Sequence, residues 1–321
     1  MKKFNEIFID KTKYGEKIQT SEYEKQGKHI IVDQGQAEIA GYTNREEGLF
    51  IDVPAIIFGD HTRVIKYIDE PFFLGADGVK VLRCKEKNAN YKYLYYALKS
   101  AKIPNTGYNR HFKWLKDVEI NYPDSVKQGK IVDILDRVSN VIEKRKAELC
   151  SLDDLIKARF VELFGDPIRN TQNRPTTEFI NVVKMQRGFD LPVQDRQQDG
   201  EIPVFGSNGA LDYHNVAKIH GGVITGRSGT IGKVFYTEGD FWPLNTSLFS
   251  ADTHGNNVIY LGYLLQLFDL TRFVEGTGVP TLNRNMFHNK QIIDVPIDEQ
   301  RQFAEFVKQI DKSKLKKFSA A

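Results

Sequence analysis

The stretch that runs from Tyr122-Pro123-Asp124-Ser125 to Gly165-Asp166-Pro167 decides how this chain is built. Between these two ends the sequence holds no proline and a single glycine, Gly129. A proline followed by serine is typical of a helix start, and a glycine followed by proline is typical of a helix end. We therefore expect one helix over residues 124–165, and a helix of roughly 40 residues extends about 60 Å because each residue rises about 1.5 Å.

A heptad pattern runs along this stretch. Alternating steps of four and three from Ile131 meet an apolar residue at eight of ten positions, which indicates a coiled-coil seam over about five heptads. Arg145 and Arg159 interrupt the seam, so a long amphipathic helix that lies on a domain stays open as the alternative. The apolar seam positions predicted to bind a partner are Leu135, Val138, Ile142, Leu149, Leu152, Ile156 and Leu163.

The segments before and after this stretch repeat one another. Five matches occur in the same order, and the distance between partners drifts by only a few residues, as loop insertions would cause. Such an ordered series predicts a duplicated domain. The matched pairs are Tyr42 with Tyr213, Phe72 with Phe241, Tyr93 with Tyr260, Asn109-Arg110 with Asn283-Arg284, and Gln128 with Gln300.

Each copy combines short strands with one helix. Glycines separate runs of β-branched and aromatic residues at 54–59 and 78–82 in the first copy and at 221–226 and 232–236 in the second. Amphipathic helices are expected near Tyr91–Ser100 and Val258–Leu270. The sequence thus predicts an α+β fold in which two duplicated domains are joined by long helices of coiled-coil type. The expected domain limits are 1–123, 124–165 for the long helix, 166–296, and 297–321 for a second, shorter helix.

Composition narrows the class of protein. A length of 321 residues favours two domains, and 40% apolar with 27% charged residues is the ordinary soluble mixture. No apolar run approaches the roughly 18 residues of a membrane span, and the first residues lack the pattern of a signal peptide. Two cysteines cannot form a disulfide framework, so we expect a cytoplasmic protein. A net charge of +3 is too small to indicate nucleic acid binding by itself.

No motif for catalysis, a cofactor or a metal is found. The eleven prolines include no adjacent pair, so the Asn/Asp-Pro-Pro-aromatic motif of base methylation is absent. Gly229-Thr230-Ile231-Gly232-Lys233 resembles only the end of a phosphate-binding loop. His214 and His220 lack the spacing of metal ligands on a helix, and neither cysteine lies in a CxxC pair. We therefore expect no catalytic residue, metal or cofactor in this chain.

Basic residues in loops are the candidates for DNA binding. Glycine lets a backbone approach a phosphate closely, and arginine or asparagine side chains can read the edges of guanine or adenine. For each residue, a solvated turn or an ion pair is an equally good explanation, and asparagine is also a common helix cap. The predicted DNA-binding residues are His61, Thr62, Arg63, Lys66, Asn109, Arg110, Arg227, Ser228, Thr230, Lys233, Asn283 and Arg284.

Taken together, these features resemble the specificity subunit of a type I restriction-modification system. The resemblance covers the whole chain and combines several motifs. It includes the helical segments that open with Pro123…Gln128 and Pro296…Gln300, and the loops Gly226-Arg227-Ser228-Gly229-Thr230-Ile231-Gly232 and Gly278-Val279-Pro280-Thr281-Leu282-Asn283. The end of the long helix, Arg159-Phe160-Val161-Glu162-Leu163-Phe164-Gly165-Asp166-Pro167, is similar to the first conserved region of that family.

The resemblance implies a function. Each globular domain would be a target-recognition domain that reads one half of a split, asymmetric DNA site. The helices would form an antiparallel coiled coil that spaces the two readers and docks two methyltransferase subunits. The chain itself would be non-catalytic: the partner methyltransferase would bind S-adenosylmethionine and flip the target adenine, and restriction subunits would join for cleavage. The base sequence recognised cannot be derived from these residues.

The chain differs from the family in its second helical region, which stops at Ala321 after about 25 residues whereas the family's second region is as long as its first. With a short second helix, Leu149, Leu152, Ile156 and Leu163 would expose an apolar surface. Two alternatives therefore stay open beside the specificity subunit. One is a non-catalytic interaction scaffold, and the other is a truncated, inactive allele of such a subunit.

Overall fold

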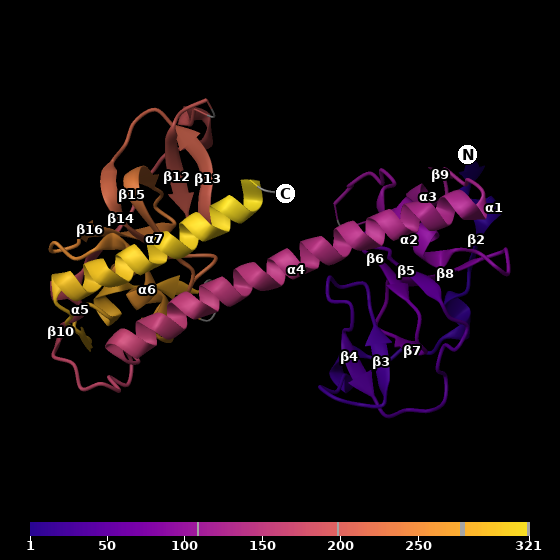
Figure 1. The fold of residues 1–321 in the computed structure, drawn as a ribbon, viewed down its shortest axis with the longest axis horizontal. Coiled ribbons are helices and arrows are strands. Elements are labelled where there is room, and N and C mark those ends of the chain that lie inside the picture. Colours follow the sequence, from indigo (N-terminus) through magenta and orange to yellow (C-terminus); the bar gives the residue numbers. More distant parts are fainter. Residues whose placement is uncertain (108, 198, 277–279, 320–321) are drawn as a thin grey trace. The chain divides into compact units, whose positions relative to one another are not determined.

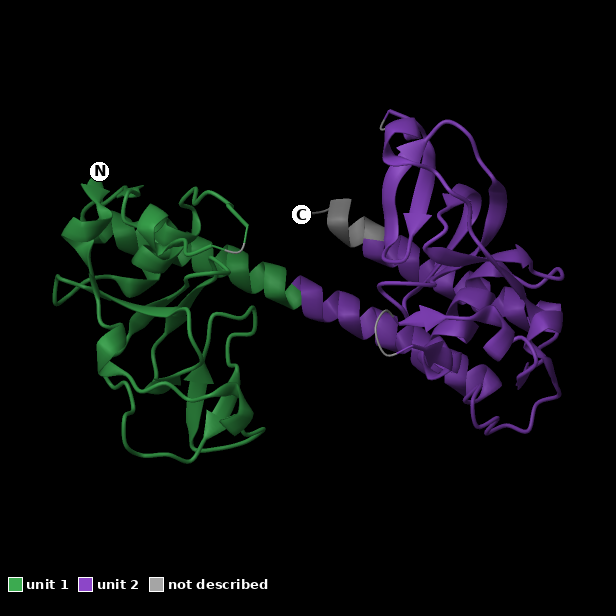
Figure 2. Cartoon of the chain, turned by 180° about the vertical axis from the view of Figure 1, so that it is seen from behind, with its two compact units in different colours: residues 1–144 green, residues 145–321 purple. Residues whose placement is uncertain are grey.

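The structure, a computed structural model, describes residues 1–107, 109–197, 199–276 and 280–319. It comprises two compact units, Met1–Lys144 and Arg145–Ala321 (Figure 2). The domain limits expected from the sequence are not tested by this division and stay a prediction. Within the expected segment 297–321, residues 320 and 321 lie outside the described part, as do Gly278 and Val279 of the second-copy loop.

The first unit is an α+β domain (Figure 1). Three sheets have the strand orders β2-β8-β5-β6, β4-β3-β7 and β1-β9. Its helices are α1 (Phe4–Ile7), α2 (Tyr91–Lys99), α3 (Phe112–Leu115) and the start of α4 (Ser125–Phe164). Its strands are β1 (Lys2–Lys3), β2 (Phe8–Asp10), β3 (His29–Val32), β4 (Gly41–Thr43), β5 (Ala55–Gly59), β6 (Ile65–Ile68), β7 (Phe72–Leu74), β8 (Val79–Cys84) and β9 (Glu119–Ile120).

The second unit has the same kinds of element (Figure 1). Its sheets have the strand orders β11-β16-β14-β15-β12-β13, β10-β19 and β17-β18. Its helices are the end of α4, α5 (Phe179–Val182), α6 (Val258–Phe268) and α7 (Ile297–Ser319). Its strands are β10 (Thr176–Glu178), β11 (Lys184–Arg187), β12 (Ile202–Gly206), β13 (Gly209–His214), β14 (Ile219–Gly226), β15 (Val234–Pro243), β16 (Ser247–Asp252), β17 (Val274–Glu275), β18 (Thr281–Leu282) and β19 (Gln291–Ile293).

The two units repeat one topology. The order β11-β16-β14-β15 of the second unit reproduces the order β2-β8-β5-β6 of the first. The neighbouring layer is repeated too, because β3 pairs in parallel with β7 and β12 pairs in parallel with the end of β15. A parallel pair beside antiparallel ones is a specific arrangement, and its recurrence confirms the duplicated α+β domain.

Polar helix ends carry the same repeat. The Asn90 side chain caps α2 by accepting from the Tyr93 amide, and Asn257 caps α6 by accepting from the Tyr260 amide. The buried Gln128 and Gln300 side chains each donate to a carbonyl five residues earlier, on Pro123 at 2.8 Å and on Val295 at 2.7 Å. Both matched pairs that the sequence placed here, Tyr93 with Tyr260 and Gln128 with Gln300, thus occupy equivalent positions.

One matched pair is shifted in the structure. The short helix before the last strand of each unit begins after His111 in the first unit and after Asn283 in the second. These N-cap residues, and not Asn109 and Asn283, are therefore equivalent. The Asn-Arg dipeptides resemble each other in sequence but sit at different points of the two loops.

Helix α4 belongs to both cores. Its first half contributes Val132 to the core of the first unit, and its second half contributes Ile156, Phe160 and Phe164 to the core of the second. Between them, Val138 and Ile142 are about half exposed, at 49% and 48%. The heptad residues therefore face different surroundings along the helix.

The expectation that the seam is exposed from Leu149 to Leu163 is wrong. Ile156 is fully buried, and Leu149, Leu152 and Leu163 are half-buried, because this part of α4 packs on its own unit. The large apolar seam residues that stay exposed lie earlier, at Val138 and Ile142.

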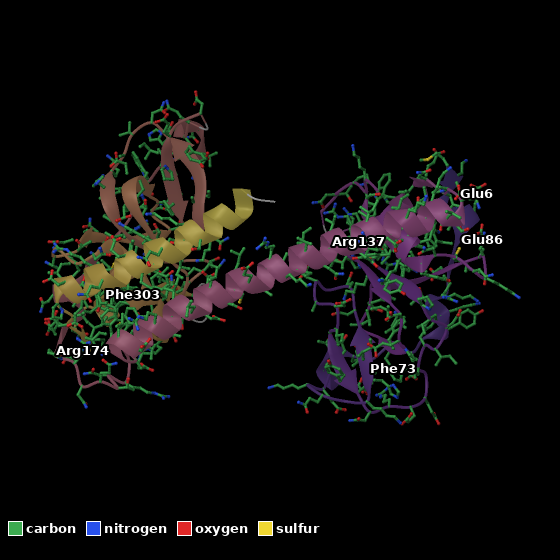
Figure 3. The ribbon with its side chains drawn as sticks, viewed as in Figure 1. Glu6, Phe73, Glu86, Arg137, Arg174 and Phe303 are labelled. Carbon is green, nitrogen blue, oxygen red and sulfur yellow. The ribbon has the colours of Figure 1, made fainter. Side chains whose placement is uncertain are left out.

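Helices α4 and α7 lie antiparallel within the second unit. The rings of Phe160 and Phe303 are 5.4 Å apart, and the Lys314 ammonium lies 2.7 Å from the Asp153 carboxylate, so the residue numbers of the two helices run in opposite directions. Figure 3 labels Phe303 on α7 and Arg174, which follows α4. Arg174 joins their other ends: it donates to the Leu163 carbonyl at 2.6 Å and to Glu299 at 2.8 Å. These contacts describe a short antiparallel pair, whereas a coiled coil over five heptads remains a prediction.

Candidate nucleic-acid interface

The predicted loops follow equivalent strands. In the first unit β5 ends at Gly59 and the His61-Thr62-Arg63 turn follows, and in the second unit β14 ends at Gly226 and Arg227 follows. Gly59 pairs with Val79 of β8, and Gly226 pairs with Ser247 of the equivalent β16. Both groups of candidate residues thus follow the carboxyl end of equivalent strands, β5 and β14.

The loop after β14 is tightly closed. A Cβ atom on Gly226 would lie 1.8 Å from the Thr230 carbonyl oxygen, so only glycine allows this approach. The backbone of Arg227 is fixed on both sides, since its amide donates to the Thr246 carbonyl at 2.9 Å and its carbonyl accepts from the Leu282 amide at 2.8 Å. The loop therefore presents the Arg227 side chain from a rigid backbone.

Three predicted residues of the second unit come together. Arg227, Asn283 and Arg284 line one hollow of about 350 Å³. The Asn283 side chain caps the turn that follows it, accepting from the Asn285 amide at 3.1 Å, so its role there is structural. Further residues that line the hollow, and that the sequence analysis did not select, are Arg187, Leu248, Glu275, Thr281, Leu282 and Asn285.

The other predicted residues of this loop do not line the hollow. Ser228 forms a β-bridge with Thr281, Thr230 is exposed, and the Lys233 ammonium donates to the Asn208 side chain at 2.7 Å. Ser228 and Thr230 shape the loop that carries Arg227, and Lys233 holds it to the neighbouring turn.

In the first unit a larger hollow, of about 790 Å³, lies beside β6 and α2. Thr62, Arg63 and Lys66 line it together with two lysines that were not predicted, Lys92 and Lys99. The Lys92 ammonium lies 2.7 Å from the Asp136 carboxylate, an interaction that raises the pKa of the lysine and lowers the pKa of the aspartate. Three tyrosines and further acidic side chains complete the wall: Tyr67, Tyr95, Tyr96, Glu38 and Glu143.

The turn that carries Arg63 is built by hydrogen bonds. The Thr62 hydroxyl donates to the Gln34 carbonyl at 2.6 Å, and the His61 amide donates to the Gln34 side chain at 3.1 Å. Arg63 adopts a left-handed backbone, with φ of 61°, and its guanidinium donates to the Ile103 carbonyl at 3.2 Å. A non-glycine residue in this conformation is uncommon and indicates a turn held by its surroundings.

Lys66 is placed differently from its prediction. Only 5% of the residue is exposed, and its ammonium donates to the Ala37 carbonyl at 2.5 Å and lies 3.5 Å from the Asp33 carboxylate. Burial lowers the pKa of this amine. The side chain joins β6 to the loop after β3, and a group held in this way is not free to contact DNA.

Asn109 and Arg110 do not line the large hollow. The Asn109 side chain donates to the Thr106 carbonyl and stabilises its own loop. Arg110 is exposed, and the pKa of Asp77 is lowered mainly by its hydrogen bond to Lys17 and to a smaller extent by the charge of Arg110. The structure therefore brings together Thr62, Arg63 and Lys66 around one hollow of the first unit, and Arg227, Asn283 and Arg284 around one hollow of the second.

The described part of the chain offers no cluster of three metal-ligating side chains. Within the same residues, no helix is both long and apolar enough to cross a membrane. Cys84 and Cys150 are both free, and Cys150 is exposed on α4.

Comparison with known proteins assigns the family. A model of the type I restriction modification DNA specificity domain matches residues 1–150 and 170–318, which is nearly the whole chain and both copies of the repeat. The chain belongs to this family. As a member of the type I specificity family, it provides DNA sequence specificity in a restriction-modification system. Comparison with curated proteins gives no match.

Solved structures of type I specificity proteins are similar to this chain. The S subunit from M. genitalium has a TM-score of 0.59 at 18% identity, over 99% of this chain and 91% of that one, and this likeness supports the fold. The HsdS subunit from Thermoanaerobacter tengcongensis has a TM-score of 0.39 at 15% identity, over 82% and 74%. A chain from a study of assembly and conformational transition of the type I system has a TM-score of 0.47 at 14% identity, over 98% and 86%.

Proposed function

We propose that each unit of this specificity protein reads one half of a bipartite, asymmetric DNA site. The observation that carries the proposal is the placement of arginine-bearing loops after the equivalent strands β5 and β14. Because the domain is duplicated, equivalent edges supply two readers, and because the loops differ in sequence, the two half-sites differ. Arg63 and Arg227 are the residues we expect nearest the DNA.

The helices are proposed to space the readers and to dock two methyltransferase subunits. Support comes from the unbroken course of α4 from Ser125 to Phe164 and from the exposed apolar residues Val138 and Ile142 on it. An exposed apolar surface on a helix is typical of an interaction site. Of the seam residues predicted to bind the partner, these two are the most accessible, and Ile156 is excluded by its burial.

The chain is proposed to be the non-catalytic component of a cytoplasmic complex. S-adenosylmethionine would bind to the partner methyltransferase, which would flip the target base out of the duplex before methylating it. Restriction subunits would add cleavage. The support is the family membership together with the absence of any catalytic motif in the sequence.

The test is base-modification sequencing of DNA from cells that carry the cognate methyltransferase subunit, with and without this chain. The proposal expects a new split motif, methylated on both strands only when the chain is present. Arg227→Ala should weaken or relax one half of that motif and leave the other half unchanged. Soluble protein with no new motif would contradict the proposal, and loss of both halves in the variant would show that Arg227 acts structurally.

A further inference from the structure

The hollow of the second unit is lined by three arginines, Arg187, Arg227 and Arg284, and by one carboxylate, Glu275. Arg227 and Arg284 are half-buried, and within the described residues neither guanidinium forms an ion pair or a hydrogen bond. Arg187 is exposed and donates only to the Asn245 carbonyl, at 3.4 Å. Several arginines without anionic partners repel each other, so such a site is favourable when an electron-rich ligand occupies it.

The sheet brings these arginines to one place. Arg187, at the end of β11, pairs with Leu248 of β16, and Leu248 pairs with Thr225 of β14, two residues before Arg227. Neighbouring strands lie about 4.8 Å apart, so the backbones at Arg187 and Thr225 are roughly 10 Å apart, and Arg227 follows two residues after Thr225. The hydrogen bond from the Leu282 amide to the Arg227 carbonyl brings the segment that carries Arg284 to the same hollow.

A carboxylate lies beside the arginines. Glu275 pairs with Thr281, which in turn bridges to Ser228, so β17 and β18 extend the ladder away from Arg227. Glu275 is exposed, lines the same hollow, and forms no ion pair within the described residues. A free carboxylate opposes binding of a phosphate group, because both are anions. It does accept hydrogen bonds from an amino group.

One base pair offers both kinds of partner. In the major groove, guanine presents the N7 and O6 acceptors that an arginine binds with two hydrogen bonds, and cytosine presents the N4 amino group that a glutamate accepts from. An A·T pair also presents an amino group, on adenine N6, but its purine carries a single acceptor, N7, so it lacks the two adjacent acceptors that an arginine binds on guanine.

We propose that this hollow reads a G·C base pair of one half-site, with Arg227 or Arg284 on the guanine and Glu275 on the cytosine. The inference rests on the proposed function, because it assumes that the second unit contacts DNA, and it adds which base pair that unit requires. Arg187 then supplies positive charge at the rim, where it is more exposed than the other two.

The experiment is a selection from a pool of duplexes that contain a randomised stretch of about 30 base pairs, using the chain assembled with its methyltransferase subunits. The selected motif is then tested in competition, with each of the four base pairs placed in turn at the position of interest. Arg227→Lys and Arg284→Lys keep the positive charge but lose the bidentate hydrogen bonding of a guanidinium to guanine. Glu275→Gln loses the carboxylate. Arg169→Gln, at an exposed arginine in the loop after α4, is the matched control.

The proposal expects an invariant G·C pair in one half-site of the wild-type motif. At that position at least one lysine variant should lower the preference for G·C by about 10- to 100-fold, since a good two-bond contact discriminates by about that much. Glu275→Gln should relax the requirement for cytosine. The other half-site and the control variant should be unaffected.

Three outcomes would overturn the inference in distinguishable ways. A motif without a required G·C pair in the affected half-site would refute it and leave the proposed function intact. Equal weakening by the arginine variants on all four duplexes would assign the arginines to phosphate contacts. DNA binding with no selected motif at all would refute the proposed function, and the inference with it.

Discussion

Replacement of Phe160 by alanine should unfold the second unit at a much lower temperature. Phe160 is fully buried on α4, and its ring lies 4.9 Å from the Phe164 ring, 5.6 Å from that of Tyr260 and 5.4 Å from that of Phe303. A buried Phe→Ala change costs about 3–5 kcal/mol, and the lost aromatic pairs place this site in the upper half of that range. For a unit of this size, about 4 kcal/mol lowers Tm by roughly 8–16 °C.

Thermal unfolding is monitored by hydrogen exchange with mass spectrometry, which reports the stability of the two units separately. Val161→Ala is the control, because Val161 is the next residue on the helix and is 40% exposed. It should change the stability of the second unit by less than about 0.5 kcal/mol. A loss of stability below 1 kcal/mol for Phe160→Ala, or equal losses for the two variants, would refute the packing of α4 against α6 and α7.

Three further results are expected. His288 is partly buried and accepts a hydrogen bond from the Met185 amide, and its pKa is lowered by that burial and by the charge of Arg284. The folded state therefore disfavours protonation of His288. Its contribution to the free energy of unfolding is complete above pH 6.5 and is lost as the pH falls below that value. In urea unfolding from pH 7.5 to 5, the free energy of unfolding should fall less in His288→Gln than in the wild type. An equal fall with pH in both proteins would contradict this assignment. Lys66→Met should destabilise the first unit by about 1–3 kcal/mol, because it leaves the Ala37 carbonyl without its donor. It should not alter the salt dependence of DNA binding. If the slope of log binding constant against log salt concentration fell by about one, Lys66 would instead be a phosphate contact. Val138→Asp with Ile142→Asp should lower the mass of the complex with methyltransferase, measured by light scattering, while circular dichroism stays unchanged, and a complex of unchanged mass would remove the middle of α4 from the docking surface.

The duplicated domain could be predicted from sequence because its signals are local. Asn90 and Asn257 start helices three residues before matched tyrosines, and Gln128 and Gln300 recur at one point of their helices. Each feature depends on residues within about five positions. An ordered series of such features survives the drift that loops introduce between the copies.

The site could be predicted only in part. Arg227 and Arg284 were found by their repeated loops, whereas Arg187 reaches the same hollow through the pairing of β11 with β16, which joins residues about 60 positions apart. No local pattern encodes that register. Lys66 was predicted to bind DNA because it is a basic residue that follows the His61-Thr62-Arg63 segment, and only the fold places the Ala37 carbonyl against it.

The heptad pattern correctly predicted a long helix, but it did not predict which surfaces would cover the apolar residues of that helix. Steps of three and four describe any helix face that packs continuously, whether on one partner or on several. In α4 the pattern begins at Ile131, which packs against the core of the first unit, and ends at Leu163, which packs against the core of the second. Periodicity reports that a face is apolar and says nothing about which surface covers it.

The burial of Phe160 and Phe164 against Phe303 also sets an order of events during synthesis. The first half of α4 can pack on residues already made, but the second half waits for α7, which leaves the ribosome roughly 140 residues later. At 5–20 residues per second that interval is about 7–28 s, during which these two phenylalanines, one helical turn apart, lack their contacts with α7. Nascent chains of this length are therefore the form of the protein most exposed to chaperone capture and to aggregation, and slower translation between α4 and α7 should lower the yield of folded protein.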